Sequence, residues 1–304
     1  MPRIRSGEHE RRGLSGWSRR EFVIAGASVL VAGRPARAQN GRLTAQAVVD
    51  RIRAGVGVPW RESTVDTFKA GDPGTLVTGV AVTAMATLSV LRKAAAAGRN
   101  LIITHDPTFY AANDLPGTRA NDPVYLAKKA FLDEHHLIVW RFSDHWLARK
   151  PGEQTRALAQ TLGWTTAGAT GREGIYSTAS TTLARVAAHV RGTLAVRGGM
   201  RAVGGPDRAV RRIAVSAGTT ALAGAVELLQ DADLLVCGEP REWEAVEYVF
   251  DSAAAGQPKS MLAIGRVVSE EPGMRACAAW LRTLVTEGPI DFLPVGDPYW
   301  RPQR

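Results

Sequence analysis

Short continuous apolar runs alternate along the chain with longer stretches in which apolar residues recur at helical spacing. Continuous runs of this kind are typical of strands buried on both faces, as in parallel sheets covered by helices. The predicted strands are residues 80–83, 101–103, 137–140, 213–216, 234–236 and 261–264. The predicted helices include residues 122–136, 155–162, 181–193 and 242–255. This alternation predicts an α/β fold.

One strand–helix–strand segment occurs twice. Residues 77–107 and 210–240 align over 31 positions without a gap, with seven identities and a matched acidic residue before proline at the end. Each segment continues into a further helix and strand, so we expect two pseudo-repeated βαβαβ lobes packed around a shared cleft. The alternative is that all strand–helix–strand units look alike, but the matched ends favour a duplication.

The expected domain boundaries follow from this repeat. Residues 1–38 form a leader, residues 39–209 the first lobe with an intervening extension, and residues 210–304 the second lobe. We expect the helices at 155–193 and a loop or short hairpin at 198–205 to extend the first lobe.

The leader resembles a twin-arginine signal peptide. Residues 18–23 (SRREFV) carry the arginine pair, an apolar stretch covers residues 22–33, and Ala36-Arg37-Ala38 matches a cleavage site. The resemblance implies export of a folded protein to the periplasm or outside the cell, beginning near Gln39. The alternative is an uncleaved amino-terminal tail.

The formal charge of +9 suggests nucleic acid at first sight. The first 38 residues, however, hold eight arginines and three glutamates, so that only four net positive charges remain on the mature chain. No basic run is interleaved with aromatic residues, which argues against nucleic-acid binding. No apolar stretch reaches 18 residues, so no membrane association is expected after cleavage. Cys237 and Cys277 lie in apolar contexts and are either buried thiols or a single disulfide.

Imidazoles, carboxylates and guanidinium groups gather where the predicted strands end. In open parallel sheets, ligands bind outside these carboxyl ends. A mixture of imidazole and carboxylate suits Zn, Mn or Fe, with Mg at oxygen-rich positions. Each residue alone has an ordinary structural explanation, a hydrogen-bonded histidine or an acidic helix cap. The residues are His105, Asp106, Asp144, His145, Glu239, Arg241, Glu242, Arg266 and Glu270.

Four stretches resemble the motifs of one family. They are residues 66–73, 79–107, 237–244 and 269–274. The family is the NGG-one-interacting-factor-three-like family of dinuclear-metal proteins, often labelled type 2 GTP cyclohydrolase homologues. The resemblance implies an α/β fold of two similar lobes, a two-metal site at their junction, and assembly into dimers or a toroidal hexamer.

This chain departs from the family pattern at three positions. Asp106 replaces the second histidine of a pair, Arg266 stands where the family has a histidine, and Ser143 stands where another histidine is expected. A protonated arginine cannot ligate a metal. The resemblance then implies ligation by His105, Asp106, Asp144, His145 and Glu270.

The expected activity is hydrolysis of a small, anionic substrate by metal-activated water. Glu239 or Glu242 is the candidate general base, and Arg241 and Arg266 are candidates to grip a phosphate or carboxylate. Three versions stay open: two divalent ions, one ion with Arg266 in place of the second, or none. In the last version the protein is a non-catalytic periplasmic binding or scaffold protein with a degenerate site.

Overall fold

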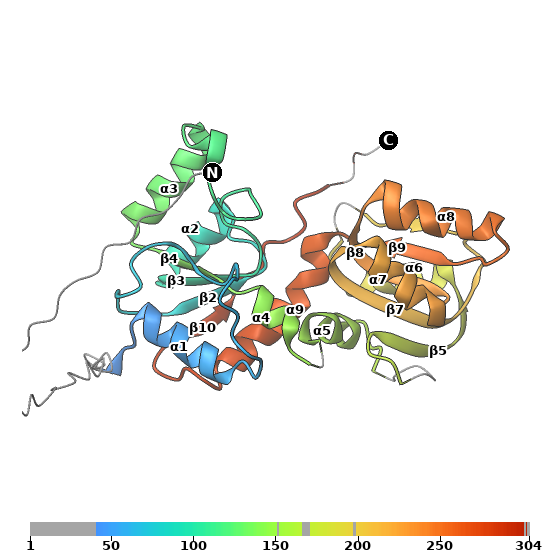
Figure 1. The fold of residues 1–304 in the computed structure, drawn as a ribbon, viewed down its shortest axis with the longest axis horizontal. Coiled ribbons are helices and arrows are strands. Elements are labelled where there is room, and N and C mark those ends of the chain that lie inside the picture. Colours follow the sequence, from blue (N-terminus) through green and yellow to red (C-terminus); the bar gives the residue numbers. More distant parts are fainter. Residues whose placement is uncertain (1–40, 151, 166–170, 197–198, 301, 303–304) are drawn as a thin grey trace, which may run out of the picture. The chain divides into compact units, whose positions relative to one another are not determined.

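Two five-stranded sheets organise the chain in a computed structural model (Figure 1), which describes residues 41–150, 152–165, 171–196, 199–300 and 302. The predicted leader lies outside these residues. The predicted α/β class is confirmed, because strands and helices alternate through both sheets. Among the described helices, none is long and apolar enough to cross a membrane.

The first sheet has the strand order β1-β4-β3-β2-β10. β2, β3, β4 and β10 are parallel, and β1 runs antiparallel at the edge beside β4. Helices α2 and α3 cover one face, and helices α1 and α9 cover the other. The strands are β1 (Phe68–Ala70), β2 (Val80–Thr83), β3 (Leu101–Thr104), β4 (Ile138–Arg141) and β10 (Ile290–Phe292). The helices are α1 (Ala45–Gly55), α2 (Leu88–Ala96), α3 (Pro123–Glu134) and α9 (Arg266–Leu281), with α4 (Asp144–Ala148) after β4.

The second sheet has the order β5-β7-β8-β9-β6, with parallel inner strands and an antiparallel strand at each edge. Helices α5 and α6 pack on one face, and α7 and α8 pack on the other. The strands are β5 (Ile175–Thr182), β6 (Arg201–Val203), β7 (Ala209–Thr220), β8 (Leu234–Pro240) and β9 (Ser260–Ala263). The helices are α5 (Glu153–Thr161), α6 (Leu183–Thr193), α7 (Leu222–Asp231) and α8 (Glu247–Ala254), the last preceded by a π-helical turn, η3 (Glu242–Val246).

The two halves of the sequence repeat share one strand register. Val80 pairs with Leu101 in the first sheet, and their counterparts Ile213 and Leu234 pair in the second. The parallel trio β2-β3-β4 thus recurs as β7-β8-β9, each time with the first strand at one side and the third at the other. The repeat is therefore present in the three-dimensional pairing as well as in the sequence.

Strand pairing does not follow the boundary expected at residue 210. β5 and β6, which we expected to extend the first lobe, pair with β7 and β9 in the second sheet. β10, expected in the second lobe, pairs with β2 in the first. The physical reason is that a parallel trio leaves two open edges, and distant segments satisfy the backbone groups of those edges.

Helix α9 carries the chain from the end of the second sheet back to the first. Its buried residues Met274, Cys277, Ala278 and Leu281 belong to the core below β2, β3 and β4. Gly273 permits close packing against α5, since a Cβ atom there would lie 2.0 Å from the Gln154 amide oxygen. The beginning of α9 therefore packs on the second sheet, and its end packs on the first.

Both cysteines are buried free thiols. Burial raises the pKa of Cys237 to about 12, against a weaker opposing hydrogen bond with Thr220. Burial also raises the pKa of Cys277 well above its ordinary value. The structure thus favours the thiol over the disulfide alternative.

We expect neither thiol to react with 5,5′-dithiobis(2-nitrobenzoate) in the folded protein at pH 8, because each is buried and protonated. Both should react in denaturant without a reductant. Rapid reaction of the native protein, or the absence of free thiols after unfolding, would contradict the assignment.

Candidate functional site: a buried histidine–carboxylate cluster

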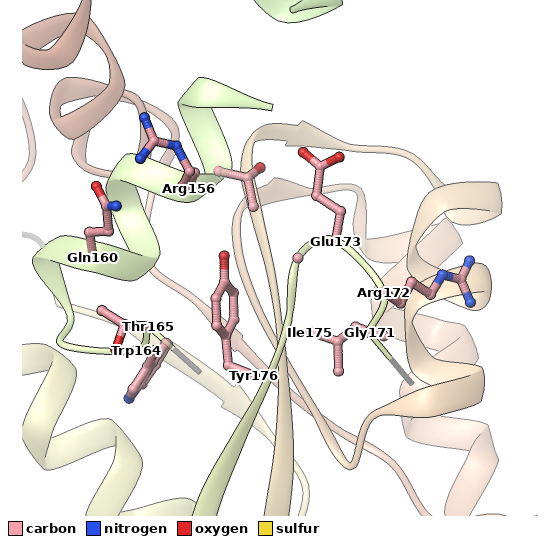
Figure 2. Close-up of a pocket in the computed structure, with 11 residues that line it drawn as sticks. Arg156, Gln160, Trp164, Thr165, Gly171, Arg172, Glu173, Ile175 and Tyr176 are labelled. Atoms are coloured by element: carbon pink, nitrogen blue, oxygen red, sulfur yellow. The ribbon is translucent and has the colours of Figure 1, made fainter. Parts of the chain in front are cut away.

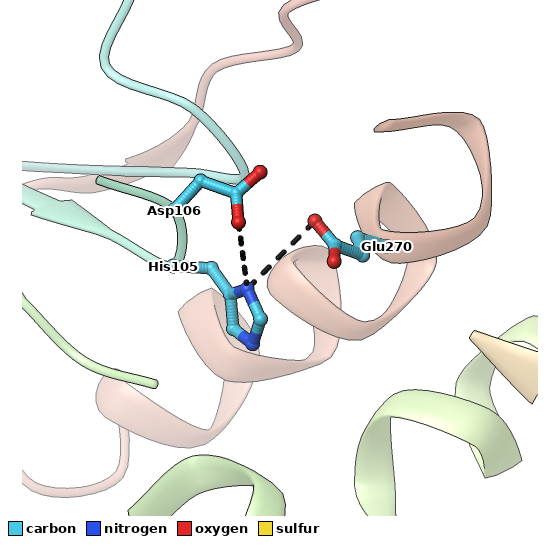
Figure 3. Close-up of side chains that lie close together, drawn as sticks. All are labelled: His105, Asp106 and Glu270. Atoms are coloured by element: carbon cyan, nitrogen blue, oxygen red, sulfur yellow. Dashed lines mark ion pairs between the residues drawn. The ribbon is translucent and has the colours of Figure 1, made fainter. Parts of the chain in front are cut away.

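Three potential metal ligands meet where β3 ends beside the first turns of α9. His105 and Asp106 directly follow β3, and their backbone N–H groups bond Thr83 and Ala84 at the end of β2. Glu270 lies just over one turn into α9 and points toward them (Figure 3). The parallel sheet thus presents two ligands at its carboxyl edge, and the helix supplies the third.

The ligand atoms of these three residues lie within 4.8 Å of one another. His105 Nδ1 is 3.7 Å from a carboxylate oxygen of Asp106 and 3.7 Å from one of Glu270. All three residues are at most 4% exposed. Two buried carboxylates beside a buried imidazole are unfavourable without a compensating cation, because desolvation penalises each charge.

Several polar atoms of the cluster have no hydrogen-bond partner among the residues that the structure describes. They are both ring nitrogens of His105 and Oε2 of Glu270, all of which are buried. Buried polar groups in folded proteins nearly always have partners, so such atoms call for an explanation. One nitrogen donor and two carboxylates fit a divalent ion of the Zn, Mn or Fe type.

Arg266 occupies the open side of this cluster. Its guanidinium group donates to Asp106 at 2.5 Å and to the Thr219 hydroxyl at 2.7 Å, and its Nε lies 3.3 Å from Glu270. The contact with Glu270 follows from helical spacing, since residues four apart share a helix face. One positive charge therefore already offsets part of the charge of the two carboxylates.

Burial and neighbouring charges set the ionisation of the carboxylates. Burial raises the pKa of Glu270 to about 7, although His105 and Arg266 oppose this. Burial also acts to raise the pKa of Asp106, but the neighbouring imidazole of His105 and guanidinium group of Arg266 outweigh it and hold that pKa below its ordinary value. Asp106 is thus the better ion-pair partner of Arg266, as its shorter contact also indicates.

Contacts from helix α5 and strand β7 hold the segment that carries Glu270 in place. The Gln154 side chain donates to the Glu270 carbonyl at 3.1 Å and accepts from the Trp146 indole at 2.9 Å. Ser269 accepts from the Gly218 N–H at 2.9 Å. At Gly238, a Cβ atom would lie 2.3 Å from the Gly218 carbonyl and 2.4 Å from the Ser269 hydroxyl. The beginning of α9 can therefore approach β7 and β8 this closely only because Gly238 has no side chain.

Asp144 and His145, the other predicted ligands, belong to a different network. His145 Nδ1 lies 2.6 Å from the Asp66 carboxylate, and its Nε2 accepts the Arg61 N–H at 3.0 Å. The Asp144 carboxylate accepts from Thr64 and from the Val65 N–H. Both ring nitrogens of His145 thus have protein partners, and the structure does not bring these two residues into the cluster.

Of the predicted general bases and anion-binding residues, only some lie beside the cluster. Glu239 lies 3.8 Å from Arg266, and both line a cavity of about 560 Å³ next to the cluster. Glu242 pairs with Arg201, and Arg241 pairs with Glu244, so Arg241 and Glu242 have other partners. Neither Asp106 nor Glu239 caps a helix, because residues 107–116 are irregular and the turn after β8 begins at Glu242.

A second cavity, of about 330 Å³, lies between α5 and the beginning of β5 (Figure 2). Arg156 and Gln160 of α5 and Trp164 lie on one side, and Tyr176 and Glu173 lie opposite. Glu173 is the single imidazole- or carboxylate-bearing residue among its lining residues within the described part of the chain. The cavity lined by Arg266 is therefore the one that adjoins the histidine–carboxylate cluster.

Some residues that build the site were not predicted. Gln154 and Thr219 hold Glu270 and Arg266 by single hydrogen bonds, and no local pattern marks either residue. Asp66 falls in a stretch that resembles the family, but its role in accepting the Ser143, Asp144 and His145 N–H groups depends on tertiary contacts. Nothing in the sequence around Gly238 indicates which atoms lie next to it in the structure.

Comparison with known proteins supports this fold. The family model Duf34/NIF3 (NGG1p interacting factor 3) matches residues 67–293. A Staphylococcus aureus hypothetical protein, SA1388, superposes with a TM-score of 0.66 at 18% identity, covering 84% of this chain and 98% of its own. A Bacillus cereus protein related to NIF3 superposes with a TM-score of 0.64 at 15% identity, and the match covers 85% of this chain and 99% of that protein. Reduced HcgD from Methanocaldococcus jannaschii superposes with a TM-score of 0.59 at 16% identity, and the match covers 83% of this chain and 99% of that protein. No curated protein matches the chain.

We expect Gly238→Ala to destabilise the protein by about 1–3 kcal/mol, because the new Cβ atom would clash with the Gly218 backbone. The matched control is Gly224→Ala in α7, where nothing lies within 4 Å of the added atom and helix propensity should add up to about 1 kcal/mol. Urea unfolding of both variants measures the difference. Equal stabilities would contradict the tight packing of α9 on β8.

Proposed function

From the premise that this chain belongs to the Duf34/NIF3 family, we propose that it is an exported hydrolase dependent on one divalent metal ion. His105, Asp106 and Glu270 would hold the ion. The chemistry that it would supply is a water molecule of lowered pKa at neutral pH. The substrate would be a small anionic compound bound in the cavity beside Arg266.

One observation supports this proposal: the buried ring nitrogens of His105 have no hydrogen-bond partner within the described ranges, and two carboxylates offer ligand atoms within 4.8 Å. A histidine kept only for structure would be expected to have a hydrogen bond, as His145 has at both nitrogens. The same cluster supports one ion rather than two. The guanidinium of Arg266 already contacts Asp106 and Glu270 and provides one of the two positive charges that a second divalent ion would otherwise bring.

The residues around the cluster would divide the remaining tasks. Glu239 is the better placed candidate for general base, since its side chain is exposed to the cavity and only 3.8 Å from Arg266. Arg266 is placed to bind a phosphate or carboxylate, and Thr219 and Asp106 hold its orientation. Glu242 forms an ion pair with Arg201, so its role would be limited to orienting that arginine, which lines the cavity.

A second candidate is a non-catalytic binding or scaffold protein, and the position of Arg266 favours it. Two carboxylates and one guanidinium form an ion-pair network that needs no metal. In that case Tm should not change in the presence of a chelator, and metal content should be near zero.

We expect the protein purified from its host to contain about one equivalent of metal per chain, and His105→Ala to contain almost none. The matched control is His135→Ala, which removes an exposed histidine at the end of α3. Elemental analysis gives the metal content, and circular dichroism checks the fold. Full occupancy in folded His105→Ala would refute the ligand assignment, and an empty wild-type protein would favour the scaffold.

We expect the exported protein to begin near Gln39. Intact-mass measurement of protein from a periplasmic extract checks this. A variant with Arg19→Lys and Arg20→Lys keeps the charge but removes the arginine pair and should stay in the cytoplasm. Export of that variant, or retention of the first 38 residues, would contradict the leader assignment.

A further inference from the structure

The cavity beside the cluster has an aromatic wall near the carboxyl end of the chain. Tyr299 and Trp300 line it, together with Arg201, Glu239 and Arg266. Tyr299 is 70% exposed and Trp300 is 68% exposed, so each ring has a large free surface. Aromatic rings next to guanidinium groups form a surface that binds planar groups by stacking and anions by charge.

Exposure alone does not identify a binding residue. Trp243 is 70% exposed as well and does not line the cavity. Tyr299 and Trp300 differ from Trp243 because hydrogen bonds join the segment before them to helix α9, which contains Arg266 and Glu270. The N–H groups of Val295 and Gly296 donate to the Glu271 carboxylate at 2.8 and 2.9 Å.

Local chain stiffness adds to this attachment. Pro298 fixes its own backbone φ and restricts the residue before it. The Tyr299 N–H donates to the Asp297 carboxylate at 2.9 Å. The aromatic pair is thus held beside Arg266 by Glu271, whose neighbour in the sequence is the cluster residue Glu270.

Two guanidinium groups, those of Arg266 and Arg201, can receive an anionic ligand group in the cavity, whose lining also holds the carboxylates of Glu239 and Asp297. The NH1 group of Arg266 donates one hydrogen to the Thr219 hydroxyl at 2.7 Å and lies 3.8 Å from the Glu239 carboxylate, so its second hydrogen can meet an anion on the cavity side. Arg201, 71% exposed, is the second guanidinium group of the lining and pairs with Glu242. A volume of about 560 Å³ has room for a ring as well as an anionic group.

We infer that the substrate class is an organic phosphate or carboxylate that carries an aromatic ring, with the ring against Trp300 and Tyr299 and the anion at Arg266. This rests on the proposed function only in taking the cavity as the place where substrate approaches the cluster. Glu271 is a positioning residue in this arrangement, because it acts by holding the segment that bears the rings.

A pair of probes tests the ring contact alone. Phenylphosphonate and methylphosphonate share the anion and differ by the ring, and water does not cleave their C–P bond. We expect isothermal titration of the full chain, as purified, to show phenylphosphonate binding about ten-fold more tightly. A variant with Tyr299→Ala and Trp300→Ala should lose most of this preference and retain its affinity for methylphosphonate.

Trp243→Ala is the matched control, because it removes an equally exposed tryptophan outside the cavity and should retain the ten-fold preference. The inference is overturned if the wild type does not prefer the aromatic probe, if the double variant keeps the preference, or if neither phosphonate binds at millimolar concentration.

Failure of this inference and failure of the proposed function are distinguishable. A protein that prefers phenylphosphonate through Trp300 but contains no metal refutes the hydrolase and retains the ligand class. A protein that takes up metal through His105 but does not distinguish the probes retains the metal site and refutes the ligand class.

Discussion

The path of helix α9 is the constraint on which the site depends. Its first turns follow β9 and pack on β7 and β8 through Ser269 and Gly218, and its later turns fill the core of the first sheet. A helix that is anchored at both ends leaves little freedom to the residues between them. Glu270 is one of those residues, and its carboxylate therefore meets the imidazole of His105 at a fixed distance.

Electrostatics explains why this meeting point is chemically unusual. Buried carboxylates are unfavourable unless a cation balances them, and here the chain itself supplies one in Arg266. The guanidinium prefers Asp106, whose pKa it helps to lower, whereas burial raises the pKa of Glu270. Within the described part of the chain, both nitrogens of His105 remain without hydrogen-bond partners. The charge of the site is thus balanced in part by an ion pair, while the imidazole keeps donor atoms that could bind a metal ion.

The contrast between the two buried histidines shows how similar residues come to differ in role. Both follow strands of the first sheet, His105 after β3 and His145 after β4. His145 stacks on Trp60 and has protein partners at both nitrogens, so it fixes the segment around residues 60–66. His105 has neither arrangement. The difference comes from the loop at residues 60–66, before β1, which contacts the end of β4 at His145 through Arg61 and Asp66.

Local pattern determined the elements of this fold and the family to which it belongs. Continuous apolar runs identify buried parallel strands, and the 31-residue repeat identifies two similar strand–helix–strand units, which the structure pairs in the same register. The motif at His105 and Asp106 likewise marks the strand end where the cluster lies. Tertiary structure alone decided which segments complete the sheets, since edge strands are chosen by open backbone groups far away in sequence. The family resemblance had already grouped Glu270 with His105 and Asp106. Tertiary structure decided that Asp144 and His145 stay outside this cluster, because hydrogen bonds to distant groups such as Asp66 and Arg61 leave no periodic trace in the chain.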